Sequence, residues 1–303
     1  MLAFHPIRLE DKTEAEACLS KQNYRLCEHC FTDLFIWKDH YNTQICVHEG
    51  YLLIKMETFP DKTPMYLAPI GSGDLKRVML DLEADAEERG IPFTLCCIPE
   101  DMIAEFEAVL PGYYMISDYI DGADYIYDVS KMATLSGKKL QSKRNFVNRF
   151  KKTYEGRWSY EPITDENKQE AYDFHIHWAQ DGDNCPNGLM YSGETCAVSL
   201  ALNHREALGM QGGILRLDGK VIAFTMGCPV SHDTFVVQLE KAEASIPGAY
   251  PMINQQFVQH VMDGYTYVNR EDDLGLEGLR KAKLSYHPAF VLTKYNATLL
   301  EEV

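Results

Sequence analysis

The chain has 303 residues, of which 46% are hydrophobic and 24% charged, the balance of a globular protein with a substantial buried core. A formal net charge of −16 repels phosphate backbones at long range and argues against a dedicated DNA-binding protein. No apolar run approaches the roughly 20 residues that cross a bilayer. Residues 1–10 lack the basic start and apolar stretch of a secretion signal. We therefore expect a cytoplasmic protein of about two domains.

The cysteines are odd in number and scattered, which predicts free buried thiols rather than a disulfide framework. They lie at Cys18, Cys27, Cys30, Cys46, Cys96, Cys97, Cys185, Cys196 and Cys228. Cys27 and Cys30 have the spacing of half a zinc site, but no second pair follows at a suitable distance. Apolar residues at helical spacing instead predict a helix over Tyr24–Lys38 with both thiols on its apolar face. We expect no metal.

Residues 1–131 have the pattern of a mixed lobe of helices and strands. The predicted elements are, in chain order, helix Thr13–Ser20, helix Tyr24–Lys38, strands Thr43–His48, Tyr51–Met56 and Met65–Ile70, helix Leu75–Arg89, strand Phe93–Cys97, helix Glu100–Leu110, and strands Tyr113–Ser117 and Asp124–Val129. Asp74 is a suitable N-cap for the third helix, and Gly90 is a suitable residue to end it.

Residues 132–155 predict a long basic connecting helix over Met132–Thr153, with Gly156 as the boundary. The elements predicted after it are strand Trp158–Glu161, helices Asp165–Gln180 and Glu194–Ala207, strands Gly213–Leu217, Val221–Gly227 and Thr234–Leu239, helix Ala249–Met262, strand Tyr267–Asn269, helix Gly275–Lys283 and strand Phe290–Tyr295. Asp218-Gly219 is a strong hairpin signal. The fold class is therefore α/β (α+β), with an N-terminal lobe at 1–131, a connecting helix at 132–155 and a C-terminal lobe at 156–303.

A first candidate site follows the apolar strand that ends at Glu240. A Pro-Gly loop then opens a helix, and the backbone N–H groups at a helix start can receive a pyrophosphate. The residues concerned are Pro247, Gly248, Ala249 and Tyr250. The alternative is an ordinary strand-to-helix turn, where proline and glycine are common.

A second candidate site follows the short strand at Tyr267–Asn269, where polar residues gather at a strand end. Glu271, Asp272 and Asp273 crowd like charges, which tends to raise a carboxyl pKa toward the range of a general base. The alternative is a solvated helix cap, with acids at the start and the bases Arg280 and Lys283 near the end.

The third candidate is the basic run from Lys138 to Lys152, which holds seven basic residues and no acidic one: Lys138, Lys139, Lys143, Arg144, Arg149, Lys151 and Lys152. Lys138, Asn145 and Asn148 fall on one helical face together with Gln141. Such a helix could hold an anionic ligand, a tRNA acceptor end or an acidic protein surface. The alternative is a solvated linker helix.

Two segments, 137–150 and 269–288, resemble the bacterial family grouped with the C-terminal domain of lysyl-phosphatidylglycerol synthase. The matching residues are Gly137, Lys138, Lys139, Lys143, Arg144, Asn145, Asn148, Arg149 and Phe150 in the first segment, and Asn269, Arg270, Glu271, Asp272, Gly275, Gly278, Leu279, Arg280, Lys283, Tyr286 and Pro288 in the second. The resemblance implies two tandem lobes of the Gcn5-related acetyltransferase fold, a plan shared with Fem-type aminoacyltransferases. Each lobe would be a mixed, mainly antiparallel sheet flanked by helices.

In that fold two parallel strands splay apart around the acyl donor, which here would involve Thr234–Leu239 and Tyr267–Asn269. The chain departs from the family's usual glycine-rich pyrophosphate loop, of which Gly248-Ala249 remains. This departure leaves both acyl-coenzyme A and aminoacyl-tRNA as possible donors. The membrane spans of the synthase relatives are absent from this sequence, so a lipid acceptor is not implied.

These considerations give a role to each candidate residue. Transfer to an amine needs a base, for which we take Glu240 or Asp272, and a proton donor, for which we take Tyr286. Asn269, Arg270, Arg280 and Lys283 join Pro247, Gly248, Ala249 and Tyr250 in binding the donor. Lys138, Arg144, Asn145, Asn148 and Glu271 bind the substrate.

The predicted function is acyl or aminoacyl transfer to an amine or hydroxyl acceptor. The alternative is a non-catalytic protein of the same fold that binds a metabolite or nucleotide. The sequence does not indicate an oligomeric state or name the acceptor.

Overall fold

The computed structural model describes residues 1–58, 61–180 and 191–300. Cys185 lies outside these residues. The chain packs into two compact units, each with its own helices and strands. Unit 1 comprises residues 1–124, 272–276 and 291–303, and unit 2 comprises residues 125–271 and 277–290.

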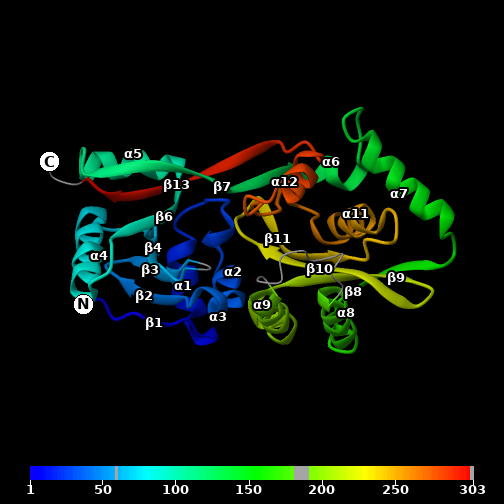
Figure 1. Cartoon of the computed structure of the whole chain (residues 1–303), viewed down its shortest axis with the longest axis horizontal. Helices are drawn as coiled ribbons and strands as arrows, with labels where there is room; N and C mark the ends of the chain where they lie inside the picture. The colour runs from blue at the N-terminus through cyan, green and yellow to red at the C-terminus, as the bar shows by residue number, and fades with distance from the viewer. Residues whose placement is uncertain (59–60, 181–190, 301–303) are drawn as a thin grey trace. The chain divides into compact units, whose positions relative to one another are not determined.

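Unit 1 is a mixed sheet with flanking helices (Figure 1). Its elements are β1 (His5–Pro6), η1 (Leu9–Asp11), α1 (Lys12–Leu19), η2 (Cys27–His29), α2 (Phe31–Ile36), α3 (Lys38–Tyr41), β2 (Gln44–His48), β3 (Tyr51–Glu57), β4 (Pro64–Leu67), β5 (Ile70–Gly71), α4 (Leu75–Arg89), β6 (Thr94–Pro99), α5 (Glu100–Val109), the first part of β7 (Tyr114–Asp128), and most of β13 (Phe290–Leu299). The strand order is β1-β2-β3-β4-β6-β13-β7, with β5 paired to β3.

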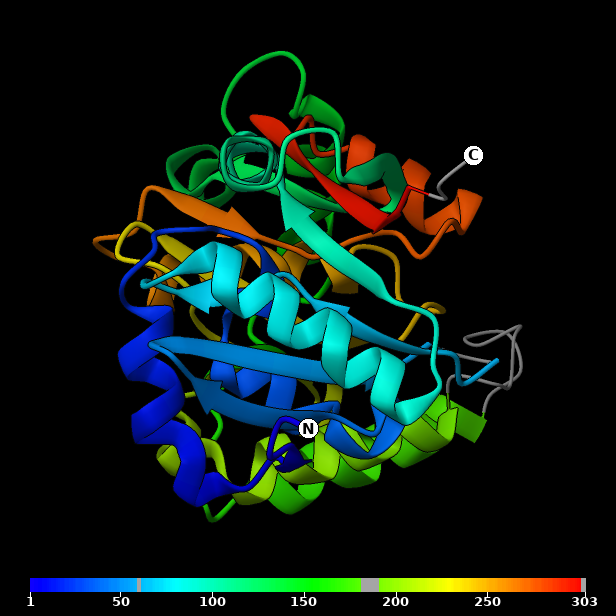
Figure 2. The ribbon, with the colours of Figure 1, turned by 90° about the vertical axis from the view of Figure 1, so that its left-hand side faces the viewer.

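Helix α4 forms where the local signals predict it. The Asp74 side chain accepts a hydrogen bond from the Arg77 backbone N–H at 3.0 Å, and Gly90 ends the helix with φ of 66°. The helix lies across the strands of unit 1 (Figure 2), and its apolar face, including Val78 and Leu82, packs against Leu53 in the core. Capping and amphipathicity therefore agree with the tertiary packing here.

The helix predicted over Tyr24–Lys38 is wrong as a continuous element. The chain instead forms η2, α2 and α3, with Cys30 in an extended conformation between the first two. The Cys27 backbone N–H donates to Asp124 at 2.8 Å, which holds this segment in place by a contact distant in sequence. Cys27 and Cys30 are buried as expected. Among the described cysteines, Cys196 departs from the expectation because it is exposed.

Unit 2 is a second mixed sheet with helices on both faces. Its elements are the last part of β7, α6 (Val129–Thr134), α7 (Gln141–Thr153), β8 (Trp158–Pro162), α8 (Lys168–Gln180), α9 (Tyr191–Asn203), α10 (Arg205–Leu208), β9 (Gln211–Leu217), β10 (Lys220–Pro229), β11 (Thr234–Ala242), α11 (Ala249–Val261), β12 (Tyr267–Asn269) and α12 (Glu277–Leu284). The strand order is β7-β12-β11-β10-β9-β8. Helix α11 covers one face of this sheet, and α8 and α9 lie on the other (Figure 1).

The predicted hairpin joins β9 and β10. Asp218 and Gly219 both have positive φ, 51° and 78°, as a two-residue turn between twisted antiparallel strands requires. The β10–β11 pair contains a β-bulge: Met226 lies opposite Leu239 and Gly227 opposite Val237, so β11 carries one extra residue.

The helix predicted over Met132–Thr153 is divided into α6 and α7. Leu135 and Gly137 take positive φ, 50° and 87°, which stops α6 and turns the chain. The Arg144 guanidinium donates to the carbonyl oxygens of both residues, so one basic side chain satisfies the carbonyls exposed by this break.

The compact units differ from the predicted ranges at the C-terminus. Residues 291–303, which hold most of β13, belong to unit 1, where β13 pairs with β6 antiparallel. The segment 272–276 also belongs to unit 1. The predicted architecture within each unit is confirmed, a mainly antiparallel mixed sheet flanked by helices.

Candidate functional site

In unit 2, the parallel strands β11 and β12 pair and then part. They are in register at Thr234 with Tyr267, and pairing ends at Val236 with Asn269. Strand β11 continues through the bulge to Ala242, while the chain after β12 turns away. The resemblance predicts this parting, and the polar residues that follow both strands lie beside it.

The centre of the site is an ion pair between Arg270 and Glu240. An Arg270 guanidinium nitrogen donates to Glu240 Oε1 at 2.7 Å, and Asn254 Nδ2 donates to Glu240 Oε2 at 3.1 Å. Both charged side chains are largely buried, with 15% and 10% exposure. Burial lowers the pKa of Arg270, but Glu240 together with Tyr127 and Tyr286 outweighs burial and raises the pKa overall. Both oxygens of Glu240 are therefore hydrogen-bonded.

Tyr286 lies beside two cations in this site. The Arg270 guanidinium carbon is 4.9 Å and the Lys143 Nζ 4.2 Å from the centre of its ring, distances typical of cation–π contacts. Burial raises the pKa of the Tyr286 hydroxyl, while Arg270 partly opposes that rise. Burial, and then the charge of Arg270, lower the pKa of the Lys143 amine. The site thus combines a protonated phenol with a lysine that loses its proton more readily than a free one.

Lys283 and Tyr127 tie the strand end to helix α12. The Lys283 ammonium donates to the carbonyl oxygen of Arg270, and the Tyr127 hydroxyl donates to the carbonyl oxygen of Lys283 at 2.9 Å. Lys283 is 8% exposed. These contacts fix the backbone that carries Arg270, and they give Lys283 a structural role in addition to its positive charge.

The start of α11 is the expected pyrophosphate position. Gly248 precedes the helix with φ of 94°, and a Cβ there would lie 2.9 Å from a backbone carbonyl oxygen of α7. The Ala249 N–H donates to Ile246 at 3.1 Å, and Pro251 has no N–H. This helix start therefore offers few backbone donors to an anion. Of the other residues predicted here, Pro247 is exposed and Tyr250 half-buried.

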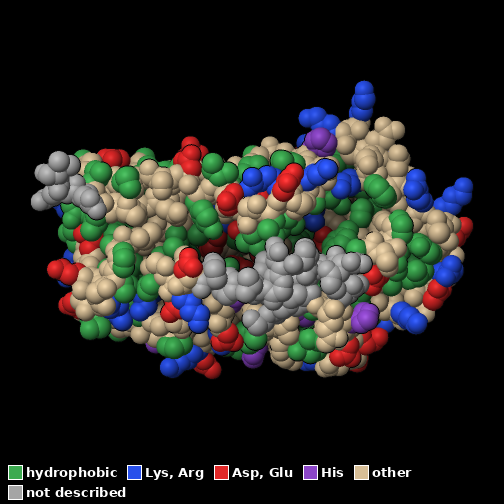
Figure 3. Space-filling view, in the orientation of Figure 1, with side chains coloured by type: hydrophobic (Ala, Val, Ile, Leu, Met, Phe, Trp, Pro, Cys, Tyr) green, Lys and Arg blue, Asp and Glu red, His purple; other side chains and the backbone are tan. Residues whose placement is uncertain are grey.

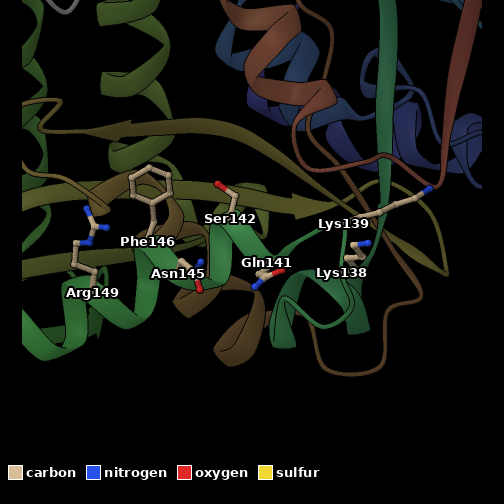
Figure 4. Close-up of a pocket in the computed structure, with 7 residues that line it drawn as sticks. All are labelled: Lys138, Lys139, Gln141, Ser142, Asn145, Phe146 and Arg149. Atoms are coloured by element: carbon tan, nitrogen blue, oxygen red, sulfur yellow. The ribbon is translucent and has the colours of Figure 1, made fainter.

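A groove with a volume of about 470 Å³ runs along α7 and the turn before it (Figure 4). It is lined by Lys138, Lys139, Gln141, Ser142, Asn145, Phe146 and Arg149. Lys and Arg side chains gather over this part of the unit 2 surface in the space-filling view (Figure 3). The Phe146 ring, 41% exposed, offers an apolar face among the cations. Cations interleaved with an exposed ring suit a nucleic-acid strand or another polyanion.

The residues predicted to bind substrate have different positions. Lys138 and Asn145 line the groove, and Asn148 is exposed. Arg144 instead closes the turn between α6 and α7. Glu271 is half-buried with φ of 58°, and its backbone N–H donates to the Asn269 side chain at 2.6 Å.

Asn269 is fully buried, and its side chain therefore shapes the turn after β12. Arg280 is half-buried on α12 in unit 2. Asp272 belongs to unit 1, where its side chain accepts a hydrogen bond from the Leu274 backbone N–H at 3.3 Å. Glu240, Arg270 and Tyr286 are thus brought together, and Asp272 packs with the other unit.

Two residues of the site had no role assigned from the sequence, although Lys143 belongs to the basic run that forms the third candidate site. Lys143 lies on the face of α7 that also holds the buried Leu140 and Val147. A lysine on an otherwise apolar helix face is unusual, and this position in the sequence indicates a buried amine. Asn254 is the first of three consecutive buried amides in the middle of α11, which is unusual for a helix interior facing a sheet.

A separate buried charge cluster lies in unit 1. Cys27, Glu28 and Asp124 bring potential metal-ligand atoms within 4.8 Å of one another. The fully buried Lys294 ammonium lies 2.8 Å from Asp124 and 2.5 Å from Glu28. This cluster therefore contains its own cation. Burial lowers the pKa of nearby His29 to about 3.

Comparison with known proteins places the chain in a family. Residues 22–298 match the family described as phosphatidylglycerol lysyltransferase, C-terminal. The chain belongs to this family. The family description is that of a transferase, which agrees with the resemblance read from the sequence.

A conserved protein of unknown function from Bacteroides thetaiotaomicron has a similar structure, with 42% identity, a TM-score of 0.92 and coverage of 99% of this chain and 100% of that one. A structure titled L-PGS from Bacillus licheniformis matches with 18% identity and a TM-score of 0.66 over 97% of this chain and 93% of that one. FemX matches with 8% identity and a TM-score of 0.64 over 99% and 98%. At such low identity the last two show the fold alone, which is the tandem acetyltransferase-like fold.

An uncharacterised protein of Mycoplasmoides gallisepticum is 27% identical over 198 residues, which are 63% of this chain. The match spans 61% of the length of that curated relative. Within the described ranges, none of the helices is both long enough and apolar enough to cross a membrane.

Proposed function

We propose that unit 2 transfers an aminoacyl group from the acceptor end of a tRNA to an amine or hydroxyl acceptor. The observation that carries this proposal is the buried Arg270–Glu240 pair at the parting of β11 and β12, on the same unit as a basic groove. The description of the family as a lysyltransferase supports transfer of an amino acid.

The start of α11 favours aminoacyl-tRNA over acyl-coenzyme A as donor. Coenzyme A carries a pyrophosphate that this fold receives on free backbone N–H groups at that helix start. Here the Ala249 N–H is used within the turn and Pro251 has none. The groove on α7, with Lys138, Lys139 and Arg149, offers positive charge in another place. A tRNA end uses such charge through its phosphates.

Arg270 is the residue we propose for stabilising negative charge in the reaction. Glu240 and the rings of Tyr127 and Tyr286 hold its guanidinium in a buried position, where a fixed cation acts strongly on a developing oxyanion. The Tyr286 hydroxyl is protonated at neutral pH, as any tyrosine is. Burial raises its pKa, and the charge of Arg270 opposes that rise and so favours donation of the proton to the leaving group.

The attacking amine must lose a proton, and two groups of unit 2 are proposed for this role. Glu240 is the carboxylate predicted from the sequence, although Arg270 and Asn254 occupy both its oxygens. The Lys143 amine has a pKa lowered by burial and by Arg270, which makes its neutral form more accessible. Asp272, on unit 1, remains a proposal on the sequence pattern alone.

The second candidate function is binding without catalysis. The observation that favours it is that Arg270 and Asn254 hydrogen-bond both oxygens of Glu240. A non-catalytic protein would hold an anionic ligand between Arg270 and Lys143 and would need no free base. In that case the protein would bind a metabolite or nucleotide without turning it over.

The proposal predicts that the basic groove binds aminoacyl-tRNA, which variants of its cations can test. The groove variant Lys138→Ala/Lys139→Ala/Arg149→Ala removes three cations, and the exposed-surface variant Lys62→Ala/Lys76→Ala/Lys220→Ala removes three cations elsewhere. Binding is measured by fluorescence anisotropy over a range of salt concentrations. We expect the groove variant to lose about two units of the salt slope of log K, since each phosphate contact contributes roughly 0.7 to 0.9. Equal effects of the two variants would argue against the groove.

A further inference from the structure

The Lys143 side chain lies in the candidate site of unit 2 without a negatively charged partner. Its Nζ is 4.2 Å from the centre of the Tyr286 ring, and the Arg270 guanidinium carbon lies 4.9 Å from the same point. Arg270 is paired with Glu240, whereas Lys143 forms no ion pair with any acid in the described ranges. A charged amine that is partly withdrawn from water normally has such a partner.

These surroundings favour the neutral form of the amine. Burial, and then the charge of Arg270, lower the pKa of Lys143. The carboxylate of the site is engaged elsewhere, because Glu240 accepts hydrogen bonds from Arg270 and Asn254. A lysine becomes a nucleophile in proteins when it is desolvated or lies beside another cationic group. Lys143 meets both conditions.

The position of Lys143 on α7 places it next to the basic groove. Ser142, the residue before it, and Phe146, on the next turn, both line that groove (Figure 4). The Lys143 side chain is half-buried, so it keeps part of its contact with solvent. An activated acyl group that is delivered along α7 therefore arrives beside a partly exposed amine.

We infer that Lys143 is itself an acyl acceptor, so that unit 2 becomes acylated on the Lys143 Nζ by the activated acyl group of its donor. This inference rests on the proposed function. It adds a modification site and a form of regulation to the same unit.

The reaction is the aminolysis of an ester and needs no oxidant or further reactant. The lone pair of the neutral Lys143 Nζ attacks the carbonyl carbon of the ester that joins the amino acid to the terminal ribose of the tRNA. A C–N bond forms and the C–O bond to the ribose breaks. The nitrogen gives up one proton, and the ribose oxygen takes one up. The products are an amide on Lys143 and an uncharged tRNA.

Acylation regulates the transferase because it removes this amine. An amide nitrogen is neither basic nor positively charged, so the modified Lys143 can no longer accept a proton or attract an anion. When the acceptor is scarce, the acyl group passes to Lys143 instead, and further transfer stops. The alternative is a lysine that only packs on the Tyr286 ring, and its reactivity would then follow its limited exposure.

Competitive acetylation tests the reactivity of Lys143 without any tRNA. The full-length protein is treated at neutral pH with a limiting amount of N-acetoxysuccinimide, a small activated ester, and mass spectrometry measures the acetylated fraction of each lysine. The exposed Lys138 and Lys139 of the groove are the comparison, and the same reaction in concentrated urea corrects for local sequence. We expect Lys143 to react at least about twice as fast as either of them, although it is less exposed. Labelling of Lys143 no faster than that of both overturns the inference.

A paired substitution tests whether Arg270 activates the amine. Arg270→Met/Glu240→Met removes the cation together with its carboxylate, so neither charge is left buried without its partner. We expect the excess labelling of Lys143 to disappear in this variant, with its fold checked by circular dichroism. Excess labelling that persists in the folded variant contradicts the inference. If the variant does not fold, the comparison within the wild type decides alone.

Radiolabelled aminoacyl-tRNA tests the transfer itself. Without an added acceptor, we expect label to remain on the denatured protein and to map to the peptide that contains Lys143. Lys143→Arg should not become labelled, because a guanidinium keeps its charge and is no nucleophile at neutral pH. The matched control Lys220→Arg, at an exposed position of unit 2, should become labelled as the wild type does. Equal labelling of Lys143 and the exposed groove lysines overturns the inference.

The proposed function and this inference fail in different ways. If charged tRNA binds in the groove and label reaches an added acceptor but never Lys143, aminoacyl transfer stands and self-acylation is wrong. If no tRNA binds to the full-length protein, aminoacyl transfer by unit 2 is wrong, and self-acylation from that donor is wrong with it.

Discussion

Arg270 and Glu240 form a buried ion pair of 2.7 Å at the point where two parallel strands of unit 2 separate. Asn254 donates to the other oxygen of the same carboxylate. Burying an ion pair costs desolvation free energy, which can exceed the attraction between the two charges. The presence of this pair is therefore weak evidence that it serves to stabilise the fold. Its position at the strand ends, beside Tyr286, makes a functional role for Arg270 the simplest account.

Neutralising Glu240 should impair turnover more than folding. Glu240→Gln keeps a group of the same size that can still hydrogen-bond Asn254, but it removes the charge that holds Arg270. We expect the rate of aminoacyl-tRNA discharge to amine and hydroxyl acceptors to fall about tenfold or more. Asp272→Asn should do the same if Asp272 is the base. Full activity in both variants would remove these carboxylates from the mechanism.

Lys143 should lower stability at neutral pH because the folded state disfavours its charged form. Its pKa is lowered from 10.5 by burial and by Arg270. A lowered lysine pKa costs stability wherever the group is protonated, and this cost disappears as pH rises from the folded pKa toward 10.5. We therefore expect Lys143→Met to raise the melting temperature at neutral pH, with a gain that shrinks as the solution becomes alkaline.

Lys138→Met, at an exposed position of the groove, is the control for that experiment. Its melting temperature should follow the wild type at every pH. A gain for Lys143→Met that stays constant up to strongly alkaline pH would show that lost packing or lost charge elsewhere, rather than the Lys143 pKa, sets its stability.

Lys294 should be essential for the stability of unit 1. Its fully buried ammonium pairs with Asp124 and Glu28, and removing one partner of a buried pair typically costs about 3–5 kcal/mol. We expect Lys294→Met to lower the free energy of unfolding by that amount in urea titrations. Lys131→Met, which breaks an exposed pair with Asp128, should cost less than about 1 kcal/mol. Similar losses in both variants would contradict the role assigned to burial.

Asp85 should make the protein sensitive to acid. Burial raises its pKa, but hydrogen bonds from Arg89, Tyr66 and the Leu2 backbone N–H outweigh burial and lower the pKa below 3.8. A lowered carboxyl pKa contributes stability above the unfolded value, and this contribution is lost as pH falls through the folded value. Asp85→Asn should therefore unfold more easily at neutral pH and depend less on pH below about 4, as circular dichroism can follow. If Asp85→Asn loses stability with falling pH as steeply as the wild type does, Asp85 is not the cause of the acid sensitivity.

Local signals in the sequence were sufficient where tertiary contacts agree with them. The bounds of α4 follow from Asp74 and Gly90, and the β9–β10 hairpin follows from Asp218-Gly219. The helix expected over Tyr24–Lys38 failed because the buried Asp124, distant in sequence, takes the Cys27 N–H. Such a competing hydrogen bond leaves no periodic trace in the chain.

The candidate site was predictable only in part for the same reason. Glu240, Arg270 and Tyr286 could be assigned from strand ends and from family resemblance, and the structure brings them together. Asn254 and Lys143 had no role assigned in advance, because their contacts with Glu240 and Tyr286 form only in the folded unit. Asp272 lies two residues after Arg270 yet packs with unit 1, because the chain crosses between units there.

A side-by-side transfer assay tests the central claim most directly. The full-length protein is incubated with a metabolite extract as acceptor and with either radiolabelled aminoacyl-tRNA or radiolabelled acetyl-coenzyme A, and Arg270→Ala serves as the inactive comparison. We predict that label from the tRNA enters a new product, that this depends on Arg270, and that label from acetyl-coenzyme A does not. Product formed from acetyl-coenzyme A alone, or from neither donor, would contradict aminoacyl transfer by this protein.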